Sequence, residues 1–495
     1  MANLLVTGAW RDRGRIVKRN RKRTVARLPL DGTGSLTGLY VKHDHPRSWR
    51  DRIKSLWRCK AEQEFLAGQA LAAAGVTCVP MLAWGRQGTA SWLVTGELPG
   101  CRDFLSVWKE GCAAAAPEPL ERFLRGVAVF QARLAQAGVD HPDLHAGNVL
   151  IREVEAGCEL VLVDVYGVRL SRRHAVAATE PAPELFFWIA GILQELPPAR
   201  VRRFWLECGG RPERFLAFWA ELWDGFRRYE ARHWLGRRER LTQESSLVQR
   251  VATERGSWHL FRPFPLGTAE RVVAGHDRRL TENCDVLKRD AKRCLTRVTI
   301  GDTAYVVKEY RHPGPWGWWS ADARAWLNSQ RLSARGRRLA AAGCRAWLRA
   351  HDGRGFLVFD DAGPRTLATV LRGQAGVAPV GVCRWLEVAG RLVARLHRAG
   401  IFHADLKPTN FMAPAAEDAA PWLGLVDLDD VRFGRVLPEE RRRRNLAQLL
   451  DGVGRVFSGV VPVRARLHLL AAYRRETLMP RPQFRRLVAG LDRPG

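Results

Sequence analysis

The sequence predicts an α+β protein built from two tandem domains, and two observations carry this prediction. The chain has 495 residues, which is too long for a single typical core and suits two domains of roughly 200 to 250 residues each. A phrase also occurs twice, as HPDLHAGNVLI from His141 and as HADLKPTNFM from His403. Soon after each copy comes an apolar run that ends in aspartate, VLVD in the first half and GLVD in the second.

Four chemically distinct positions keep nearly the same register between the two halves. The pairs and their separations are Lys42 and Lys308 (266 residues), Asp143 and Asp405 (262), Asn148 and Asn410 (262), and Asp164 and Asp427 (263). Chance does not keep four such positions in register over this distance, so we infer a duplicated domain. The predicted domains are residues 1–255 and 256–495, because the charged segment between Arg232 and Pro263 shows no clear periodicity.

Each half is expected to begin with antiparallel strands that lead to a helix. Runs rich in β-branched and aromatic residues predict the strands, which are GRIVKRN, TVARLPL and GLYVKHD in the first half and CDVLKRD, LTRVTIG and AYVVKEY in the second. The third strand of each half carries the paired lysine. A helix follows it, KAEQEFLAGQALAAAG or ADARAWLNSQRLSARG, and each of these ends in a glycine suited to a C-cap. Further strands, a helical stretch, the repeated loop, a hairpin and helices complete each half.

The paired residues are those that phosphoryl transfer from ATP requires. Such transfer needs positioned reactants, metal-binding groups, a cation on the phosphates and a base for the attacking hydroxyl. We expect Asp143 and Asp405 to be the bases, and Lys42 and Lys308 to neutralise the α- and β-phosphates. The expected Mg²⁺ ligands, which are hard oxygen donors, are Asn148, Asp164, Asn410 and Asp427. One Asp with an Asn five residues later usually marks a turn, but the complete ordered set, found twice, favours catalysis.

These motifs resemble those of the protein-kinase-like superfamily. HPDLHAGN and HADLKPTN stand where catalytic loops do, and DVYG and DLDD stand where the metal-binding DFG motif does. Within that superfamily the chain is similar to the bacterial lipopolysaccharide kinases of the Kdo/WaaP family, which phosphorylate inner-core sugars. The features that carry this likeness are the VLKRDAKRC to YVVKEY hairpin, the ADARAWLNSQRL helix, the HADLKPTNFM loop and the RRRRNLAQLL helix.

The resemblance implies a fold and a reaction for each copy. The fold is a small N-terminal antiparallel-sheet lobe followed by a larger helical C-terminal lobe. The reaction moves the γ-phosphate of ATP, with Mg²⁺, onto a sugar hydroxyl of the lipopolysaccharide inner core (Kdo or heptose) or of a related glycolipid. A protein or small-molecule kinase, or a scaffold in which one copy is a pseudokinase, remains the alternative.

The chain departs from the kinase pattern in two places. Neither first hairpin has a G-x-G-x-x-G loop; KRNRKRT and KRDAKRC stand there, so either basic side chains approach the phosphates or the hairpins are simply exposed. Neither catalytic loop has an arginine before its aspartate, since Pro142 and Ala404 occupy that place. Control by activation-loop phosphorylation is therefore not expected, which is more typical of small-molecule kinases. We expect His141 and His403 to hold their loops by hydrogen bonds.

The two copies differ around the lysine and the base. In the first, Glu64 is expected to pair with Lys42, whereas aligning the two helices puts Ala325 at that position in the second. The second copy then either orients Lys308 through Asp322 or Glu309, or binds nucleotide less well. It has Lys407 two residues after its base, where a γ-phosphate contact is possible, and the first copy has His145 there. The sequence does not rank the two copies.

The net charge of +29 points to an acidic partner, although an arginine-rich composition alone also explains it. We expect a peripheral enzyme on the cytoplasmic face of the inner membrane, with Lys18 to Arg23 and Arg441 to Arg444 as basic clusters near anionic lipid or substrate phosphates. The apolar run LFFWIAGIL is too short to span a bilayer, and the N-terminus has too short an apolar stretch for a secretory signal. No nucleic-acid partner is expected, since no recognised motif accompanies the charge.

Overall fold

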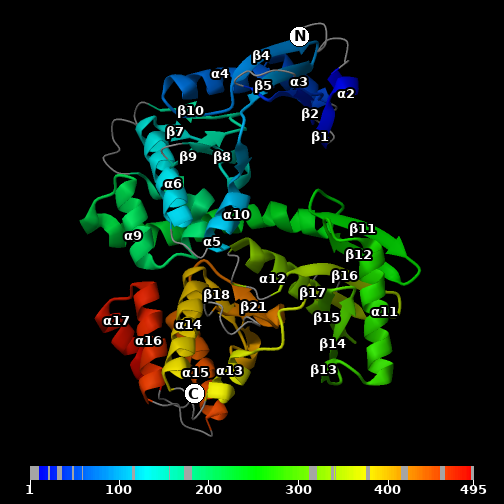
Figure 1. Cartoon of the computed structure of the whole chain (residues 1–495), viewed down its shortest axis with the longest axis vertical. Helices are drawn as coiled ribbons and strands as arrows, with labels where there is room; N and C mark the ends of the chain where they lie inside the picture. Colours follow the sequence, from blue (N-terminus) through cyan, green and yellow to red (C-terminus); the bar gives the residue numbers. More distant parts are fainter. Residues whose placement is uncertain are drawn as a thin grey trace. The chain divides into compact units, whose positions relative to one another are not determined.

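The protein's structure, a computed structural model, divides the chain into two units (Figure 1). The first comprises residues 1–189 and 199–219, and the second comprises 190–198 and 220–495. The described residues are 10–19, 23–30, 36–46, 49–57, 59–113, 118–154, 157–171, 181–311, 320–335, 339, 342–374, 379–413, 422–457 and 463–491.

A five-stranded antiparallel sheet opens the first unit, in the order β1-β2-β3-β5-β4. Its strands are β1 (Arg15–Arg19), β2 (Arg23–Pro29), β3 (Gly38–Asp44), β4 (Met81–Gln87) and β5 (Ala90–Glu97). Successive side chains of a strand face opposite sides, so Val41 enters a buried cluster with Trp10 and Trp92 on one face. Lys42 therefore faces the other side, where its side chain reaches Glu64 of helix α4 (Lys60–Ala73).

The remainder of the first unit holds the repeated loop between short strands. Strands β6 (Cys101–Asp103), β8 (Val149–Val154) and β9 (Gly157–Leu162) form one sheet, and β7 (Val139–Asp140) pairs with β10 (Arg169–Leu170). The other elements that lie wholly or partly in this unit are α2 (Trp10–Arg13), α3 (Trp49–Trp57), α5 (Phe104–Ala113), α6 (Glu118–Gln136), the 3-10 turns η1 (Ala146–Asn148), η2 (Pro183–Ile189) and η3 (Pro212–Arg214), α9 (Pro198–Glu207) and α10 (Phe215–Thr242). The apolar run LFFWIAGIL forms the end of η2 and the short helix α8 (Ala190–Leu193), and most of its side chains are buried.

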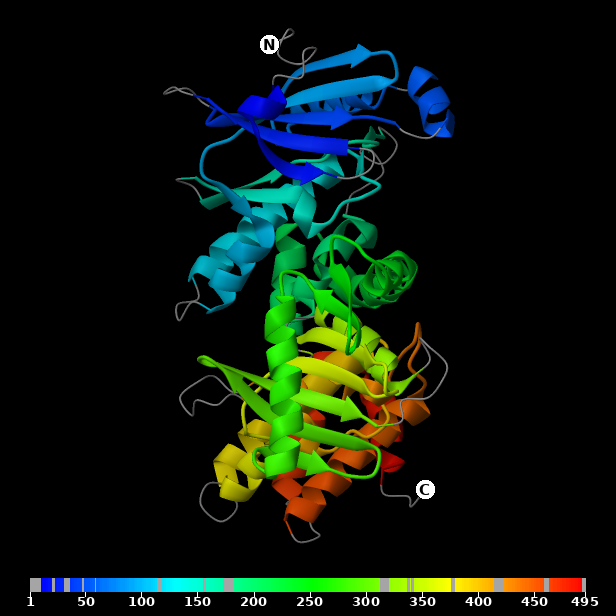
Figure 2. The same cartoon turned by 90° about the vertical axis from the view of Figure 1, so that its right-hand side faces the viewer.

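The second unit has a seven-stranded antiparallel sheet in the order β11-β12-β16-β17-β15-β14-β13. Its strands are β11 (Val248–Thr253), β12 (Gly256–Phe261), β13 (Val286–Arg289), β14 (Arg293–Ile300), β15 (Thr303–Tyr310), β16 (Cys344–Ala350) and β17 (Gly355–Asp360). Helix α11 (Leu266–Glu282) lies across the strands on one face (Figure 2). Helix α12 (Ala321–Arg335) contributes to a separate buried cluster with Tyr310 and Leu357.

Helices dominate the C-terminal part of the second unit. They are α13 (Leu367–Gln374), α14 (Pro379–Arg398), α15 (Glu439–Val456), α16 (Val463–Thr477) and α17 (Arg481–Ala489), with α14 beside α16 (Figure 1). Short pairs frame the second loop: β18 (Ile401–His403) with β21 (Val431–Phe433), and β19 (Phe411–Met412) with β20 (Gly424–Leu425), alongside η5 (Pro408–Asn410) and η6 (Leu428–Asp430). One large apolar core joins these helices and strands.

The structure confirms the predicted α+β class, with antiparallel sheets followed by helices. It differs from the sequence analysis in the segment between Arg232 and Pro263, which holds the end of α10 and the β11–β12 hairpin. Strand β12 pairs with β16, so residues 220–255 lie with the second unit and not with the first. A boundary near residue 255 would fall inside this hairpin. The sequence gives no local signal that the hairpin belongs to the second unit, because β16, the strand that pairs with β12, lies about 90 residues later.

Candidate active sites

The first repeated loop is held by its histidine. The Nδ1 atom of His141 accepts a hydrogen bond from the backbone N–H of Asp143 at 3.2 Å, so its proton is on Nε2, which donates to the carbonyl oxygen of Asp164 at 2.9 Å. Burial lowers the pKa of His141, which keeps the ring neutral. The Asp143 carboxylate is 72% exposed and thus open to an acceptor. The expected scaffold role of His141 agrees with this geometry.

The metal-ligand candidates of the first unit lie next to that loop. Asn148 donates from Nδ2 to the backbone carbonyl of Asp143 at 3.0 Å. No described residue makes a hydrogen bond to its Oδ1, which is the atom a cation would use. Asp164 comes directly after the β9 region, with one carboxylate oxygen 4.0 Å from Nζ of Lys42. Lys42 and Asp164 thus lie together, and Asp143 and Asn148 are joined on the loop whose histidine contacts the backbone of Asp164.

Lys42 is anchored by helix α4. Its Nζ donates to the carboxylate of Glu64, whose side chain is 1% exposed, and to the backbone carbonyl of Val163 at 3.0 Å. Arg23, on the neighbouring strand β2, approaches Glu64 at 3.5 Å and Asp164 at 3.8 Å. Arg23 also forms a hydrogen-bonded ion pair with Asp44 at 2.8 Å. The first unit thus places two cations against three carboxylates.

The loop of the second unit repeats the arrangement of the first. Asp405 donates its N–H to Nδ1 of His403 at 3.2 Å, and Asn410 donates from Nδ2 to the carbonyl of Asp405 at 2.8 Å. Burial lowers the pKa of His403, as it does for His141. The Nζ atom of Lys407 donates to the Asp405 carboxylate at 2.6 Å, whereas the nearest atoms of His145 and Asp143 are 3.9 Å apart. The base candidate of the second unit therefore has a cation in direct contact.

Lys308 is anchored differently from Lys42. Its Nζ donates to Asp427 at 2.6 Å and to Asp429 at 2.8 Å, and Asp429 is almost fully buried. Tyr310 donates its hydroxyl to the same Asp429 oxygen at 2.7 Å. Arg293 completes the group, with Nη1 3.2 Å from Asp429 and 3.6 Å from Asp427.

The two residues proposed from the sequence to orient Lys308 do not do so. Asp322 accepts a hydrogen bond from the indole N–H of Trp347 at 2.7 Å. Glu309 follows Lys308 in the strand and so faces the other side of the sheet, where it meets His276 at 3.4 Å and Arg354 at 3.2 Å. Asp429 has the role instead, because the turn after Asp427 brings its carboxylate to Nζ.

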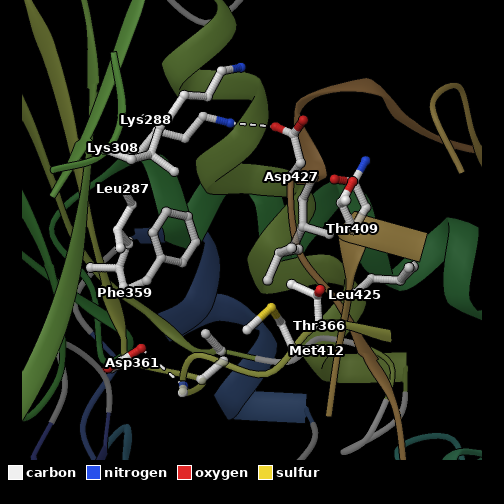
Figure 3. Close-up of a pocket in the computed structure, with 18 of the residues that line it drawn as sticks. Leu287, Lys288, Lys308, Phe359, Asp361, Thr366, Thr409, Met412, Leu425 and Asp427 are labelled. Atoms are coloured by element: carbon white, nitrogen blue, oxygen red, sulfur yellow. Dashed lines mark hydrogen bonds and ion pairs between the residues drawn. The ribbon is translucent and has the colours of Figure 1, made fainter. Parts of the chain in front are cut away.

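A cavity of about 510 Å³ lies beside Lys308 in the second unit (Figure 3). At one end the lining is apolar, with Leu287 and Phe359 on the sheet side and Met412 and Leu425 facing them. At the other end Lys308 points toward Asp427. Further charged and amide groups of the lining are Lys288, Arg293, Lys407, Asn410 and Asp429. An apolar chamber that leads to cations and oxygen ligands suits a base attached to phosphates.

The electrostatics keep both metal-ligand aspartates ionised. Burial opposes ionisation of Asp164, but the positive charges of Lys42 and Arg23 outweigh it and hold the pKa of this carboxyl below its ordinary value. Burial likewise opposes ionisation of Asp427, and Lys308 with Arg293 lowers its pKa. An ionised carboxylate beside an amide oxygen is a ligand set that Mg²⁺ accepts, so Asn148 with Asp164 and Asn410 with Asp427 fit the ion.

The role of Asp429 was not predicted from the sequence, and the sequence left open whether basic side chains of the two hairpins face the sites or solvent. Arg23 and Arg293 belong to the basic hairpins, but their side chains turn into the sites. Arg23, at 12% side-chain exposure, is thus not part of an exposed basic cluster; Asn20, Arg21 and Lys22 of that cluster lie outside the described residues. The signal for Asp429 was present in DLDD, where an acid stands two residues after Asp427 and Tyr166 stands in the first copy.

Comparison with known proteins identifies the family. The sequence profile of the lipopolysaccharide kinase (Kdo/WaaP) family matches residues 7–177 and 354–457, which is more than half of the chain. The chain belongs to the lipopolysaccharide kinase (Kdo/WaaP) family. The first matched segment contains Lys42, Glu64 and both loop residues of the first unit, and the second contains the loop and Asp427 of the second. Family membership supports kinase activity, with ATP as phosphate donor and lipopolysaccharide as the class of acceptor.

One solved structure similar to this Kdo/WaaP family member is described as "WaaP in complex with acyl carrier protein". The identity is 21%, the match covers 47% of this chain and 94% of that chain, and the TM-score is 0.34. None of the curated proteins compared with the chain matches it. Every helix in the described part of the chain is too short or too polar to cross a bilayer.

Proposed function

We propose that the protein moves the γ-phosphate of ATP onto a sugar hydroxyl of the lipopolysaccharide inner core, Kdo or heptose, or of a related glycolipid. The single observation that carries this proposal is the convergence, in each unit, of a lysine, an ionised aspartate, an asparagine oxygen and an open aspartate. In the second unit the lysine, the asparagine and the metal-ligand aspartate line a cavity that also has apolar walls. The duplicated order of motifs makes the two units tandem copies of one kinase-like domain.

Each residue has a distinct task in the proposed transfer. Asp143 and Asp405 accept the proton of the attacking hydroxyl. Lys42 and Lys308 bind the phosphates of ATP, and Arg23 and Arg293 add positive charge at the place where other kinases use a glycine-rich loop. The asparagine and aspartate pairs, Asn148 with Asp164 and Asn410 with Asp427, would hold Mg²⁺, which would neutralise phosphate charge. Lys407, at the Asp405 carboxylate, is placed to meet the transferred phosphate.

The acceptor is expected to approach the second loop from the side of helix α15. Asn445 and Gln448 of this helix donate to the backbone carbonyls of His403 and Ala404, at 2.5 and 2.6 Å. One turn earlier, Arg441 and Arg444 are exposed and lie over the ring of Phe402, 5.6 and 5.9 Å from its centre. No described carboxylate pairs with either arginine. We propose that they bind a phosphate or carboxylate group of the acceptor.

An acceptor carried by lipid places the enzyme at a membrane. We propose a peripheral protein on the cytoplasmic face of the inner membrane, where each Lys or Arg near an anionic surface contributes on the order of 1 kcal/mol. The net charge of +29 supports this location.

The test is transfer of labelled phosphate from ATP to cell-envelope glycolipid. Asp143→Ala and Asp405→Ala are each expected to lower the transfer of their own unit by roughly 10²-fold to 10⁴-fold. Asp302→Ala, in the exposed turn between β14 and β15, is the matched control and keeps the wild-type rate. If each single change removes a distinct product, both units are catalysts; if only one change has an effect, the other unit is a pseudokinase. A double variant as active as wild type contradicts the proposal.

A further inference from the structure

Helix α3 of the first unit exposes a stripe of large apolar side chains. Trp49 is 68% exposed, Ile53 is 50% exposed and Trp57 is 86% exposed. Residues four apart lie on the same face of a helix, so the three side chains form one row about 12 Å long. Most of the described tryptophans are buried, which makes two strongly exposed ones in a nine-residue helix unusual. An exposed row of this kind marks an interaction surface.

The same helix is basic. Its sequence, WRDRIKSLW, contains three basic residues and one acidic residue, and the exposed Arg52 lies next to Ile53. Arg47 precedes the helix and Arg58 follows it in the sequence. Tryptophan prefers the boundary between headgroups and acyl chains, and lysine and arginine attract anionic lipids.

The charge pattern favours a bilayer over a protein as the occupant. The centre of a protein interface is depleted of charged residues, and a stable interface buries on the order of 1,200 Å² or more, far beyond one row on a short helix. Interfacial helices, in contrast, combine an apolar row with basic neighbours and insert only a few ångströms. In the second copy, Trp316, Trp318 and Trp319 follow Lys308 in the sequence and lie outside the described residues.

We propose that α3 inserts Trp49, Ile53 and Trp57 into the headgroup boundary of an anionic membrane. The exposed Arg52 then stays at the level of the lipid phosphates. This proposal deepens the proposed function, since a lipid-borne acceptor is reached at that surface. It concerns binding alone, because no candidate site residue belongs to α3.

Vesicle sedimentation of the full-length protein, without ATP or acceptor, tests the proposal. With vesicles of phosphatidylethanolamine and phosphatidylglycerol, Trp57→Glu is expected to weaken binding about ten-fold and Ile53→Glu with Trp57→Glu about 100-fold. Trp57→Leu should keep most of the binding. Leu216→Glu, at a side chain 63% exposed on α10 of the same unit, makes the same charge change elsewhere and should stay within about two-fold of wild type.

Two outcomes overturn the membrane proposal. One is a Trp57 and Ile53 double variant that binds as tightly as wild type. The other is wild-type protein that binds neither these vesicles nor vesicles of phosphatidylglycerol alone, which would assign the row to a protein partner. Phosphate transfer to a lipid-free core sugar tests the proposed function separately from membrane binding. In this assay the double variant should transfer phosphate at the wild-type rate. If the wild-type protein itself transfers none, the kinase proposal fails, and the proposal for α3 is judged by the vesicle experiment alone.

Discussion

The two units hold their nucleotide lysines with carboxylates that come from different elements. In the first, Glu64 reaches Lys42 from helix α4; in the second, Asp429 reaches Lys308 from the turn after Asp427. The exchange is reciprocal in the sequence, because Ala325 occupies the position of Glu64 and Tyr166 occupies that of Asp429. Both carboxylates are almost fully buried. The shared requirement is therefore a buried anion at Nζ, and its place in the sequence is free to change.

The helix that lost its glutamate is attached to the site in another way. Asn328 of α12 donates to the backbone carbonyl of Leu428 at 2.8 Å and to that of Val431 at 3.1 Å. The corresponding residue of α4 is Ala67, which has no group to donate. The first unit thus links helix to lysine, whereas the second links helix to the metal-ligand loop. Asp429 and Asn328 of the second unit together therefore take the place of the Lys42–Glu64 ion pair of the first.

Among the substitutions that test this comparison, Asp429→Ala should lower phosphate transfer the most. Asp429→Ala leaves Lys308 without its buried partner, and breaking a buried pair costs roughly 3 kcal/mol or more, so we expect transfer by the second unit to fall about 100-fold. The measurement is phosphate transfer in an Asp143→Ala background, which isolates the second unit. Asp430→Ala, at the adjacent exposed acid, is the control. An equal loss in both variants would refute the anchoring role.

Removal of Glu64 should lower phosphate transfer by the first unit nearly as much, and a second substitution is expected to restore part of the loss. Glu64→Ala is expected to lower transfer by the first unit about 50-fold in an Asp405→Ala background. Adding Tyr166→Asp puts a carboxylate at the position that Asp429 has in the second unit, and should raise the transfer rate about ten-fold. Tyr166 is 38% exposed, so we expect the fold to accept this change. Tyr166→Ala is the matched control and should restore nothing. Equal rates with Tyr166→Asp and Tyr166→Ala would show that the carboxylate cannot move between these positions.

The Tyr310 hydroxyl makes a smaller contribution in the second unit. Burial raises the pKa of Tyr310 well above its ordinary value, so the hydroxyl keeps its proton and donates it to Asp429. Tyr310→Phe removes this hydrogen bond and preserves the ring, with an expected loss of about ten-fold in transfer, as for a hydrogen bond to a charged group. Tyr305→Phe, in the same strand, should change the rate less than two-fold. A loss as large as that of Asp429→Ala would make the tyrosine, and not the lysine, the main partner of Asp429.

The smallest expected effect concerns pH. The folded-state pKa of Asp427 lies below its unfolded value of 3.8, so the ionised carboxylate adds stability that is fully present above about pH 4 and is lost as pH falls through the folded pKa. The difference in urea midpoint between wild type and Asp427→Asn should therefore be constant from pH 7 to 5 and shrink below pH 4. Asp164→Asn should behave alike, because its pKa is shifted in the same direction. A difference that vanishes above pH 5 would contradict the assigned shift.

Local signals in the sequence predicted the strands, the lysine helices and both loops. Asp143 and Asn148 are five residues apart on one loop, so spacing alone brings them together. The partner of Lys308 was not predictable in the same way, because 121 residues separate it from Asp429 and only the folded turn selects this acid over Asp322 or Glu309. The orientation of Arg23 and Arg293 was open for a similar reason, since a strand residue faces inward or outward according to register, and register depends on the partner strand.

The β11–β12 hairpin has a practical consequence for anyone who wishes to separate the halves. A fragment that starts at residue 256 would lack β11, and the outer edge of β12 would then carry unpaired backbone N–H and C=O groups beside apolar side chains. Bare edges of this kind recruit strands from other chains and promote aggregation. The fragment would also lose the backbone carbonyl of Leu241, which accepts from the indole of Trp326. Soluble expression of the second half alone therefore depends on keeping residues that precede the duplicated motifs.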